Sequence, residues 1–523
     1  MSATTVRAPS AMVASVDHLA TASGVHLLRA GGSAADAAIA ASAVLAVTAP
    51  HLCGMGGDLF ALVHGHGAAA PAALNAAGRA GSGVDAGQLR AEGHVTMPFR
   101  GDLRSAPVPG CVDGWLALHD RFGVAPLAAV LAPAIGYAID GFPASPLLAG
   151  LAGVVAGVPG AGVLGTPIRT GERIARPGVG AALTAIAERG RAGFYGGTFG
   201  AGLLALGPDV YAKSDLEAPL ADWVEPLAVR VWGHDVWTVP PCSQGYLTLL
   251  SAAIAEGLEL PDDTHTGAWA HLLVESARAA GHDRCGVLYE HADVRPLLEP
   301  AAVRARREWI DSDHRALLRT ASGAGDTMFL CAVDSEGSGV SLIQSNASGF
   351  GCHVFEPGTG VGLHNRGLGF SLVDGHPAEA GPGRRPPHTL SPGLVTRADG
   401  SLRAVLGSMG GDSQPQILLQ LLVRLLHHGR SAGSVIGAPR WALTSGSPSG
   451  FDTWVEPDAT RVAVEGSADP GWAAGLEARG HEVDIVDGMT GAFGHAQLID
   501  VVDDGSLAGA ADPRAMIGAA QGY

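Results

Sequence analysis

The chain opens with two segments whose apolar residues recur at helical spacing. LATASGVHLLRAGG, at 19–32, predicts a helix that ends at its Gly-Gly pair. SAADAAIAASAVLAV, at 33–47, predicts a second helix with Ser33 as the N-cap and Asp36 three residues on, close to a capping box. The many alanines of the second helix predict close packing against another helix or a sheet.

The middle of the first half mixes short strands with helices. DLFALVHG, at 58–65, predicts a strand after a glycine turn, and PAALNAAGRA predicts a strand end that runs into a loop near residues 75–79. The pattern over residues 112–206 is helical with Gly and Pro interruptions. WAHLLVESARAAGHDRCGVLY, at 269–289, predicts one long amphipathic helix.

The periodicity changes after Thr327. TMFLCAVD and SGVSLIQS predict two strands joined by the turn SEGS, and LRAVLGS predicts another strand that ends in Met-Gly-Gly-Asp. QPQILLQLLVRLLHHG, at 414–429, predicts a long amphipathic helix. The charged, then Gly/Ser-rich segment at 304–326 is the most linker-like part of the chain. Strands and helices in both halves favour an α+β or a layered αββα arrangement.

Composition requires a packed protein. Of the 523 residues 47% are hydrophobic and 16% charged, which excludes a disordered chain and fits one large unit or two intimate domains. The net charge of −17 argues against a nucleic-acid partner. The six cysteines are scattered without a CxxC pair, which favours buried free thiols in a reducing compartment.

The sequence predicts a cytoplasmic location without a membrane partner. The N-terminus lacks the charged and apolar regions of a secretory signal. The longest uncharged stretch, at 141–168, contains four prolines and many glycines, so we do not expect it to span a membrane.

Three short patterns are better explained without chemistry, so we expect no cofactor and no metal. GAGVLG, at 160–165, fits a dinucleotide-binding pattern but is not followed by a helix-like sequence. GRSAG places Ser431 in a nucleophile-elbow pattern, yet a helix rather than a strand precedes it. The histidine pairs at 64–66 and 427–428 have no nearby ligands at metal-site spacing.

Thr327 is the candidate nucleophile. It stands between a Gly-rich leader and a strand, in GAGDTMFL. A threonine hydroxyl needs a base, and the α-amino group of the same residue serves as one after cleavage of the preceding bond, because its pKa lies near 7.7–8.0. The alternative interpretation is a threonine that simply begins an edge strand.

The chain resembles the γ-glutamyltransferase family of N-terminal nucleophile (Ntn) hydrolases over nearly its whole length. Five ordered segments carry the resemblance: GVHLLRAGGSAADAAIAASAVLAVTAPHLCGMGGDLF at 24–60, LNAAGR at 74–79, DTMFLCAVDSEGSGVSLIQSNASGFG at 326–351, RRPPHTLSPGLV at 384–395 and GSMGGD at 407–412. The resemblance implies a four-layer αββα sandwich of the Ntn-hydrolase type. It also implies autocleavage between Asp326 and Thr327, into a large subunit of residues 1–326 and a small subunit of residues 327–523.

The resemblance also implies the roles of further residues. Gly410 and Gly411 would supply backbone N–H groups to an oxyanion, in agreement with their position between a strand and a helix. Ser345 falls where the family has a hydroxyl beside the amino group of the nucleophile. Thr389 and Arg79 fall where the family binds a substrate carboxylate, a task that suits a guanidinium.

Three departures from the family pattern bear on the substrate. Met328 and Phe329 follow the nucleophile in place of the usual Thr-His or Ser-His. Gly369, after Leu368, stands where the family's transferases carry an acidic residue for the substrate α-amino group. The third departure is the missing secretory signal. Together they favour the branch that includes glutaryl-cephalosporin acylases, glutathione hydrolase-like proteins and oxamate amidohydrolases.

The sequence therefore predicts an autoprocessing amidohydrolase or acyltransferase. Its partner would be a small amide whose acyl group carries a carboxylate, either γ-glutamyl or a desamino, glutaryl-like group. The mature protein would be a heterodimer of its own two fragments, with a higher oligomer left open. The alternatives are an oxamate-type short-chain amidohydrolase of the same family and a non-catalytic binding protein on this fold.

Overall fold

Two seven-stranded sheets lie face to face at the centre of the computed structural model, which describes residues 3–316, 326–445, 453–454, 457–486 and 491–523. The strand order is β21-β2-β10-β11-β3-β4-β7 in the first sheet and β1-β20-β19-β15-β14-β9-β8 in the second. The strands of the first sheet are β2 (Met12–Ser15), β3 (Asp58–His64), β4 (Ala72–Ala76), β7 (Asp222–Val224), β10 (Asp326–Val333), β11 (Gly339–Ala347) and β21 (Ala519–Gly522). Those of the second are β1 (Val6–Ala8), β8 (Leu227–Val231), β9 (His234–Thr238), β14 (Gly393–Thr396), β15 (Leu402–Ser408), β19 (Ala496–Val501) and β20 (Leu507–Ala511).

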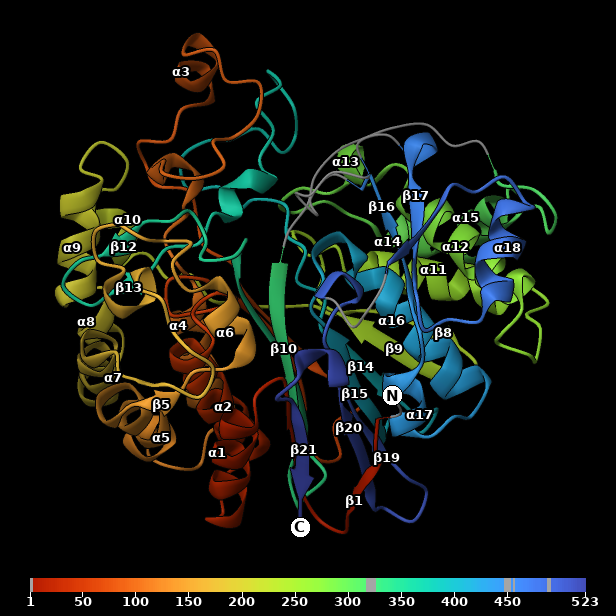
Figure 1. Ribbon diagram of the computed structural model, residues 1–523, viewed down its shortest axis with the longest axis horizontal. Coiled ribbons are helices and arrows are strands. Elements are labelled where there is room, and N and C mark those ends of the chain that lie inside the picture. The colour runs from red at the N-terminus through yellow and green to blue at the C-terminus, as the bar shows by residue number, and fades with distance from the viewer. Residues whose placement is uncertain (1–2, 317–325, 446–452, 455–456, 487–490) are drawn as a thin grey trace.

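Helices cover the outer face of each sheet, so the molecule has four layers (Figure 1). On the side of the first sheet lie α1 (His18–Arg29), α2 (Ala34–Thr48), α4 (Cys111–Phe122), α5 (Leu127–Asp140), α6 (Pro146–Leu151), α7 (Pro177–Arg189), α8 (Arg191–Phe194) and α9 (Thr198–Leu206). On the side of the second lie α11 (Tyr246–Glu256), α12 (Gly267–Gly281), α14 (Arg295–Leu298), α15 (Pro300–Arg307), α16 (Gln414–Leu422), α17 (Ala432–Gly437) and α18 (Pro470–Glu477). This arrangement confirms the predicted αββα sandwich.

Small elements complete the chain outside the four layers. The strands β16 (Trp441–Thr444), β17 (Arg461–Glu465) and β18 (Val483–Val486) form a three-stranded sheet. Two further pairs are β5 (Phe142–Pro143) with β6 (Arg173–Ile174) and β12 (Phe355–Glu356) with β13 (Val361–Gly362). The remaining short helices are α3 (Ala86–Ala91), α10 (Lys213–Glu217) and α13 (Arg284–Val287).

Strand β10 shows how the sequence pattern builds the layers. Its residues point alternately to opposite faces, as in any strand. Met328 and Leu330 join the apolar layer beneath helices α1 and α2, while Phe329 and Cys331 join the layer between the two sheets. Both sets are almost fully buried. An uninterrupted apolar run is what a strand covered on both faces requires.

The structure confirms several local predictions. Ser33 caps α2 in a complete capping box with Asp36. The hairpin of β10 and β11 is antiparallel and turns between Val333 and Gly339. Helix α16 begins at Gln414 as predicted and continues into a π-helical turn.

The prediction of one helix over residues 269–289 was wrong. Helix α12 ends at Gly281, and the short helix α13 follows. The chain turns there because the Arg284 side chain is held in the interior, where its Nε donates to Gln244 Oε1 at 2.9 Å. The predicted linker at 304–326 begins inside α15, and its part at 317–325 lies outside the described residues.

Both sheets contain strands from both sides of Thr327. In the first sheet β10 and β11 lie between β2 and β3, which come from the beginning of the chain. In the second sheet β14 pairs with β9 and β20 pairs with β1. Neither the chain before Thr327 nor the chain after it therefore completes a sheet without the other.

Within the described residues, no helix combines the length and apolarity that crossing a membrane requires. All six cysteines are free thiols, and five are buried, as the sequence predicted, while Cys285 is partly exposed.

Candidate functional site

Thr327 lies at an irregularity in the first strand after the linker. Asp326 pairs with Ala347 and Met328 with Gln344, so the register of β10 against β11 shifts at Thr327. The Thr327 side chain is buried, and its hydroxyl donates to Ser345 Oγ at 3.3 Å. The structure therefore places two of the predicted site residues in direct contact.

Arg366 connects this pair of hydroxyls to Thr389. Its Nη2 donates to Ser345 Oγ at 3.3 Å and its Nη1 donates to Thr389 Oγ1 at 3.1 Å. The guanidinium is almost fully buried, and burial lowers the pKa of Arg366 to about 10. At that pKa the guanidinium remains protonated at neutral pH. A positive charge is therefore linked to Thr327 through the Ser345 hydroxyl.

A buried carboxylate and two histidines hold this segment in place. Asp58 Oδ2 lies 2.9 Å from His388 Nε2 and 3.3 Å from His364 Nδ1. Burial alone would raise the pKa of Asp58, but the two histidines hold it well below its usual value. Asp58 also lies opposite Ser345 in the β3–β11 ladder. Asp58 thereby holds His388, which precedes Thr389, and His364, which lies two residues before Arg366.

The two predicted oxyanion glycines form a turn between β15 and α16. Gly410 has φ +136° and Gly411 has φ +57°, values that residues with a side chain rarely adopt. Gln244 Nε2 donates to Gly411 O at 2.9 Å and to Thr389 O at 3.1 Å. Because helix N-termini present free N–H groups, the turn is suited to bind a negative charge. The structure thus links the turn to Thr389.

The predicted carboxylate-binding Arg79 contacts a different set of groups. Its Nη1 lies 2.8 Å from Glu290 Oε1 and donates to Gly383 O at 2.9 Å, and its Nη2 lies 3.5 Å from Asp222 Oδ2. Gly78 connects the loop to the buried centre, since its N–H donates to Asp58 Oδ1 at 2.7 Å. Arg79 therefore follows a residue that contacts Asp58, but its own charge pairs with the carboxylates of Glu290 and Asp222.

Gly369 has a steric reason to lack a side chain. A Cβ atom built there would lie 2.3 Å from the backbone oxygen of Pro387, two residues before Thr389. That is closer than a real Cβ atom approaches a backbone oxygen. The backbone of the Thr389 segment therefore leaves no space for a side chain at position 369, where the sequence resemblance implied an acidic residue in transferases.

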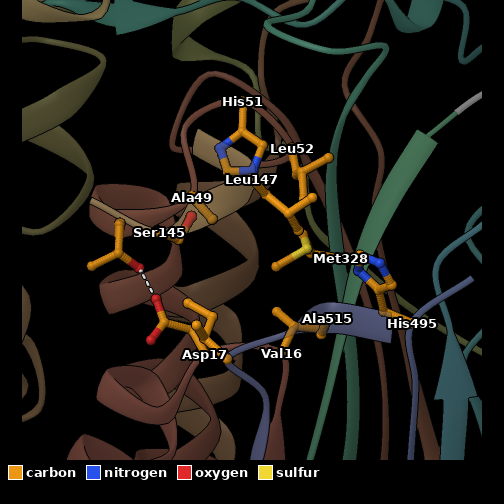
Figure 2. A pocket seen from close by; sticks show the side chains of 12 residues that line it. Val16, Asp17, Ala49, His51, Leu52, Ser145, Leu147, Met328, His495 and Ala515 are labelled. Carbon is orange, nitrogen blue, oxygen red and sulfur yellow. Dashed lines mark hydrogen bonds between the residues drawn. The ribbon is translucent and has the colours of Figure 1, made fainter. Parts of the chain in front are cut away.

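Met328, the residue after Thr327, lines a small cavity between α2, α6 and the chain near the C-terminus (Figure 2). His51 and His495 also line this cavity, and both are buried. Among the described residues, neither ring nitrogen of either histidine has a hydrogen-bond partner. Burial lowers the pKa of His51 to about 3 and that of His495 to about 4, so both rings are neutral near pH 7.

These lowered values predict loss of stability in mild acid. His51, His495 and His388, whose pKa burial lowers to about 3, take up protons at pH 5–6 only after unfolding. Stability should therefore decrease below pH 6.5, by about 1.4 kcal/mol per pH unit for each histidine. Urea unfolding of an uncleaved Thr327→Ala chain at pH 7.0 and 5.5 measures the difference. Equal stability at both values would contradict the prediction, and His51→Gln should reduce the slope by one histidine's share.

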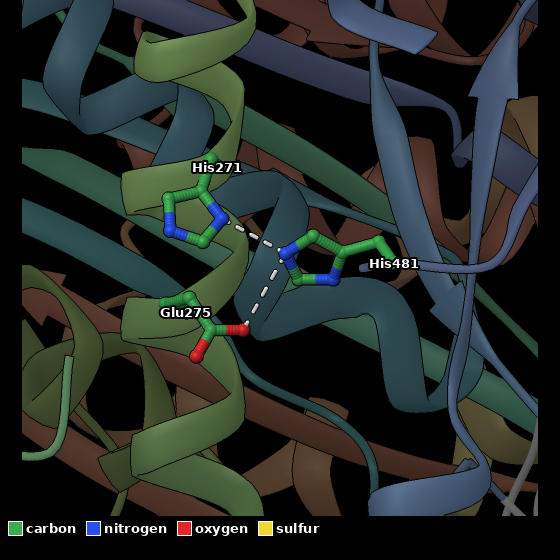
Figure 3. Close-up of side chains that lie close together, drawn as sticks. All are labelled: His271, Glu275 and His481. Atoms are coloured by element: carbon green, nitrogen blue, oxygen red, sulfur yellow. Dashed lines mark hydrogen bonds and ion pairs between the residues drawn. The ribbon is translucent and has the colours of Figure 1, made fainter. Parts of the chain in front are cut away.

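A second histidine cluster lies on helix α12, away from this group. His271 Nδ1 lies 2.9 Å from His481 Nε2, and Glu275 lies beside both rings (Figure 3). Glu275 already accepts from Arg278 Nη1 at 2.6 Å and from the N–H of Ala316 at 2.9 Å. The positive charge of Arg278, which already pairs with Glu275, disfavours a cation bound to this cluster. The cluster instead attaches residues 311–316 to α12, since His271 Nε2 also lies 2.7 Å from Asp311 O.

The weak sequence patterns have ordinary structures. Residues of GAGVLG form a 3₁₀ turn (Gly162–Gly165) rather than a strand-to-helix junction. Ser431 is the N-cap of α17, after Gly429 in a positive-φ turn. The first segment is therefore not a dinucleotide-binding loop, and the second is not a nucleophile elbow.

Sequence reasoning missed several residues of the hydrogen-bonded group. They share burial and a polar side chain: Asp58, Gln244, Arg284, His364, Arg366 and His388. One signal was available for Arg366, the one arginine in the largely apolar segment VGLHNRGLGF. The others depend on contacts between residues far apart in the chain.

The four-layer αββα sandwich is the architecture of the Ntn hydrolases. The sequence profile of the gamma-glutamyltranspeptidase family matches residues 20–522, and the chain belongs to that family. It is 34% identical to the oxamate amidohydrolase proenzyme of Klebsiella pneumoniae, over 98% of both chains. It is 33% identical to the glutathione hydrolase-like YwrD proenzyme of Bacillus subtilis, over 96% of this chain and 97% of the other.

A solved structure agrees with these sequence comparisons. The cephalosporin acylase from Bacillus halodurans superposes with a TM-score of 0.89 at 31% identity, over 99% of this chain and 97% of the other. The protein is accordingly an enzyme, an amide hydrolase or acyltransferase of this family. This confirms the resemblance that the five sequence segments indicated.

Proposed function

We propose that the chain cleaves itself between Asp326 and Thr327 and then acts as a two-fragment amidohydrolase. Residues 1–326 form the large subunit and residues 327–523 the small one. The fragments stay together because each sheet contains strands from both. The names of the two curated relatives, both called proenzymes, support processing of this kind.

In the proposed reaction the Thr327 hydroxyl attacks the amide carbonyl, and the α-amino group of the same residue takes its proton. The N–H groups of Gly410 and Gly411 bind the negative oxygen of the tetrahedral intermediate. The amino group then passes the proton to the leaving amine as the C–N bond breaks, which leaves an ester on Thr327. Water, or an acceptor amine, releases the acyl group in the second half of the reaction.

One observation carries this proposal. A continuous series of hydrogen bonds runs from Thr327 through Ser345 and Arg366 to Thr389, and on through Gln244 to Gly411. Residues from distant parts of the chain thus converge on one hydroxyl. A threonine that merely began an edge strand would need none of these partners.

The intact mass of the purified protein under denaturing conditions tests the proposal. We expect two masses that divide the chain between residues 326 and 327. A single full-length mass, unchanged on prolonged incubation, would contradict self-processing and favour a non-catalytic protein on this fold. Two masses that divide elsewhere would contradict the assignment of Thr327.

The acyl group is proposed to carry a carboxylate but no α-amino group. Gly369 has no carboxylate that could pair with an ammonium, and its close approach to Pro387 leaves no space for a side chain at this position. Thr389, Arg79 and Arg366 are the candidate groups for the carboxylate. A relative that acts on oxamate favours a short acyl chain as the second candidate, beside a glutaryl-like one.

A pair of anilides distinguishes desamino from γ-glutamyl substrates. We expect kcat/KM for glutaryl-p-nitroanilide to equal or exceed that for γ-glutamyl-p-nitroanilide, because the site offers no carboxylate at position 369 to the ammonium. The release of nitroaniline measures both rates. A γ-glutamyl preference of tenfold or more, about 1.4 kcal/mol, would contradict this view of Gly369.

A further inference from the structure

Residues 311–316, the last described segment ahead of the proposed cleavage site, are held through their main chain. From helix α12, His271 Nε2 lies 2.7 Å from the carbonyl oxygen of Asp311. Glu275 on the same helix accepts from the N–H of Ala316 at 2.9 Å. These contacts with backbone atoms fix both ends of the segment.

The same segment is also held by residues that follow Thr327 in the chain. Arg479 Nε donates to the carbonyl oxygen of Ser312 at 2.8 Å, and the N–H of Arg315 donates to the carbonyl oxygen of Arg479 at 2.8 Å. Arg315 Nη2 donates to the carbonyl oxygen of Thr460 at 3.2 Å. The proposed large and small subunits therefore both contribute to the binding of this segment.

A buried charged group supports these contacts on α12. Glu275 and Arg278 are each 1% exposed and form an ion pair at 2.6 Å, and Arg278 Nη1 also donates to the carbonyl oxygen of Ala316 at 2.9 Å. His481 Nε2 lies 3.6 Å from Glu275 Oε1 and 2.9 Å from His271 Nδ1 (Figure 3). A buried ion pair adds little net stability, because both charges lose their water, and its best-attested use is to select one arrangement of the chain. The arrangement that these residues select is the path of the segment.

The path matters because of the geometry of self-cleavage. In that step the Thr327 hydroxyl attacks the carbonyl carbon of Asp326, the C–N bond between the two residues breaks as the nitrogen takes up the hydroxyl proton, and water then hydrolyses the resulting ester. The products are the Asp326 carboxyl group and the free amino and hydroxyl groups of Thr327. Attack requires the carbon and the oxygen to approach to about 3–3.5 Å, so the direction from which the chain enters β10 affects how often that geometry occurs.

The chain ahead of the scissile bond has two fixed points. One is residues 311–316, and the other is Asp326, which pairs with Ala347 at the start of β10. Nine residues, 317–325, connect them. Without the first fixed point, the preceding helix is α15, which ends at Arg307, and eighteen residues would connect that helix with Asp326. The probability that two points of a chain meet falls with the 3/2 power of the number of residues between them, so the longer connection lowers it about threefold.

We infer that five side chains form a clamp that positions the chain for self-cleavage: His271, Glu275, Arg278, Arg479 and His481. They are positioning residues, which act on the scissile bond through the path of residues 311–316. The inference rests on the proposed function, because it takes the bond before Thr327 as the one that is cleaved. It adds that the clamp speeds maturation without contributing to turnover, since cleavage disconnects Thr327 from the segment that the clamp holds.

The test follows cleavage of the freshly synthesised full-length chain by intact mass over time, for the wild type and for a double variant. Ala316→Pro removes the N–H that donates to Glu275, and Arg479→Ala removes the donor to Ser312. The double variant should cleave itself at about one third of the wild-type rate or more slowly, the reduction expected for the longer connection. Its cleaved fraction should hydrolyse p-nitroanilides with the kcat/KM of the wild type.

Ser312→Ala is the matched control, because it changes the same segment but keeps the carbonyl oxygen that Arg479 contacts. The Ser312 hydroxyl donates to the exposed Asp313 at 3.2 Å, so its loss should leave the cleavage rate unchanged. Arg479→Lys should recover part of the rate that Arg479→Ala loses, because it keeps a cationic donor.

The outcomes separate the clamp from the proposed function. A wild-type cleavage rate in the folded double variant would overturn the inference, and so would a lower kcat/KM at an unchanged cleavage rate, which would assign these residues to the mature site. If circular dichroism shows that the double variant does not fold, the rate of Arg479→Ala alone decides in the same way, since this side chain is 21% exposed. A wild-type chain that is never cleaved would instead refute the proposed function itself.

Discussion

Thr327→Ala is expected to remain a single uncleaved chain without amidase activity. The substitution removes the only oxygen that the proposed mechanism uses to form the ester, for processing and for turnover alike. Loss of the nucleophile in an acyl-transfer hydrolase costs on the order of 10⁶-fold in kcat. Intact mass and the ammonia or nitroaniline assay measure the two effects on the same preparation.

Thr327→Ser is the control for this experiment. Serine keeps the hydroxyl that can reach Ser345 Oγ and lacks only a methyl group, so processing and activity should persist at a reduced rate. The alanine chain should fold, because the substitution leaves the sandwich intact. Its circular dichroism should therefore match that of the serine variant. A cleaved and active Thr327→Ala protein would show that the nucleophile lies elsewhere.

Gly410→Ala should have the second largest effect, a loss of about 10²–10³-fold in kcat. The φ of Gly410 is +136°, and a Cβ there would stand 2.5 Å from Ser413 Oγ. An alanine would therefore rotate the turn and misalign the N–H groups proposed to bind the oxyanion. Losing one such donor costs about 2.7–4 kcal/mol of the activation barrier. Steady-state kinetics on the cleaved fraction measures the loss.

Gly429→Ala separates backbone strain from loss of the oxyanion site. Gly429 also has a positive φ, +61°, but a Cβ there meets nothing within 4 Å. That variant should lose some stability and keep its kcat. If Gly410→Ala keeps the wild-type kcat as well, the turn does not bind the oxyanion.

Local sequence signals predicted the elements around the site. The capping box of Ser33 and Asp36 is formed within four residues, and the hairpin of β10 and β11 within one turn. Such contacts are readable because the interacting groups are neighbours in the chain. The helix over 269–289 failed for the opposite reason: its break at Gly281 serves a contact of Arg284 with Gln244 and Asp412.

The candidate nucleophile and the oxyanion turn were recognisable as segments, whereas the group between them was not. Ser345 and Thr389 came from the family resemblance, and the structure adds Arg366 as the side chain that contacts both. Arg79, which the resemblance also indicated, instead pairs with Glu290. The partner that a long side chain selects depends on where distant segments meet, and no local pattern records that.

The sequence by itself determined the alternation of Met328 and Phe329 between two apolar layers, the glycine turn at Gly410 and the position of Thr327 at the start of a strand. Those features follow from local sterics and from the two-residue period of a strand. Only the tertiary structure decided that Asp58, across the ladder from Ser345, holds His364 and His388, and so brings Arg366 to the nucleophile. The physical reason is burial: charges and hydroxyls removed from water must find partners, and folding decides which partners are within reach.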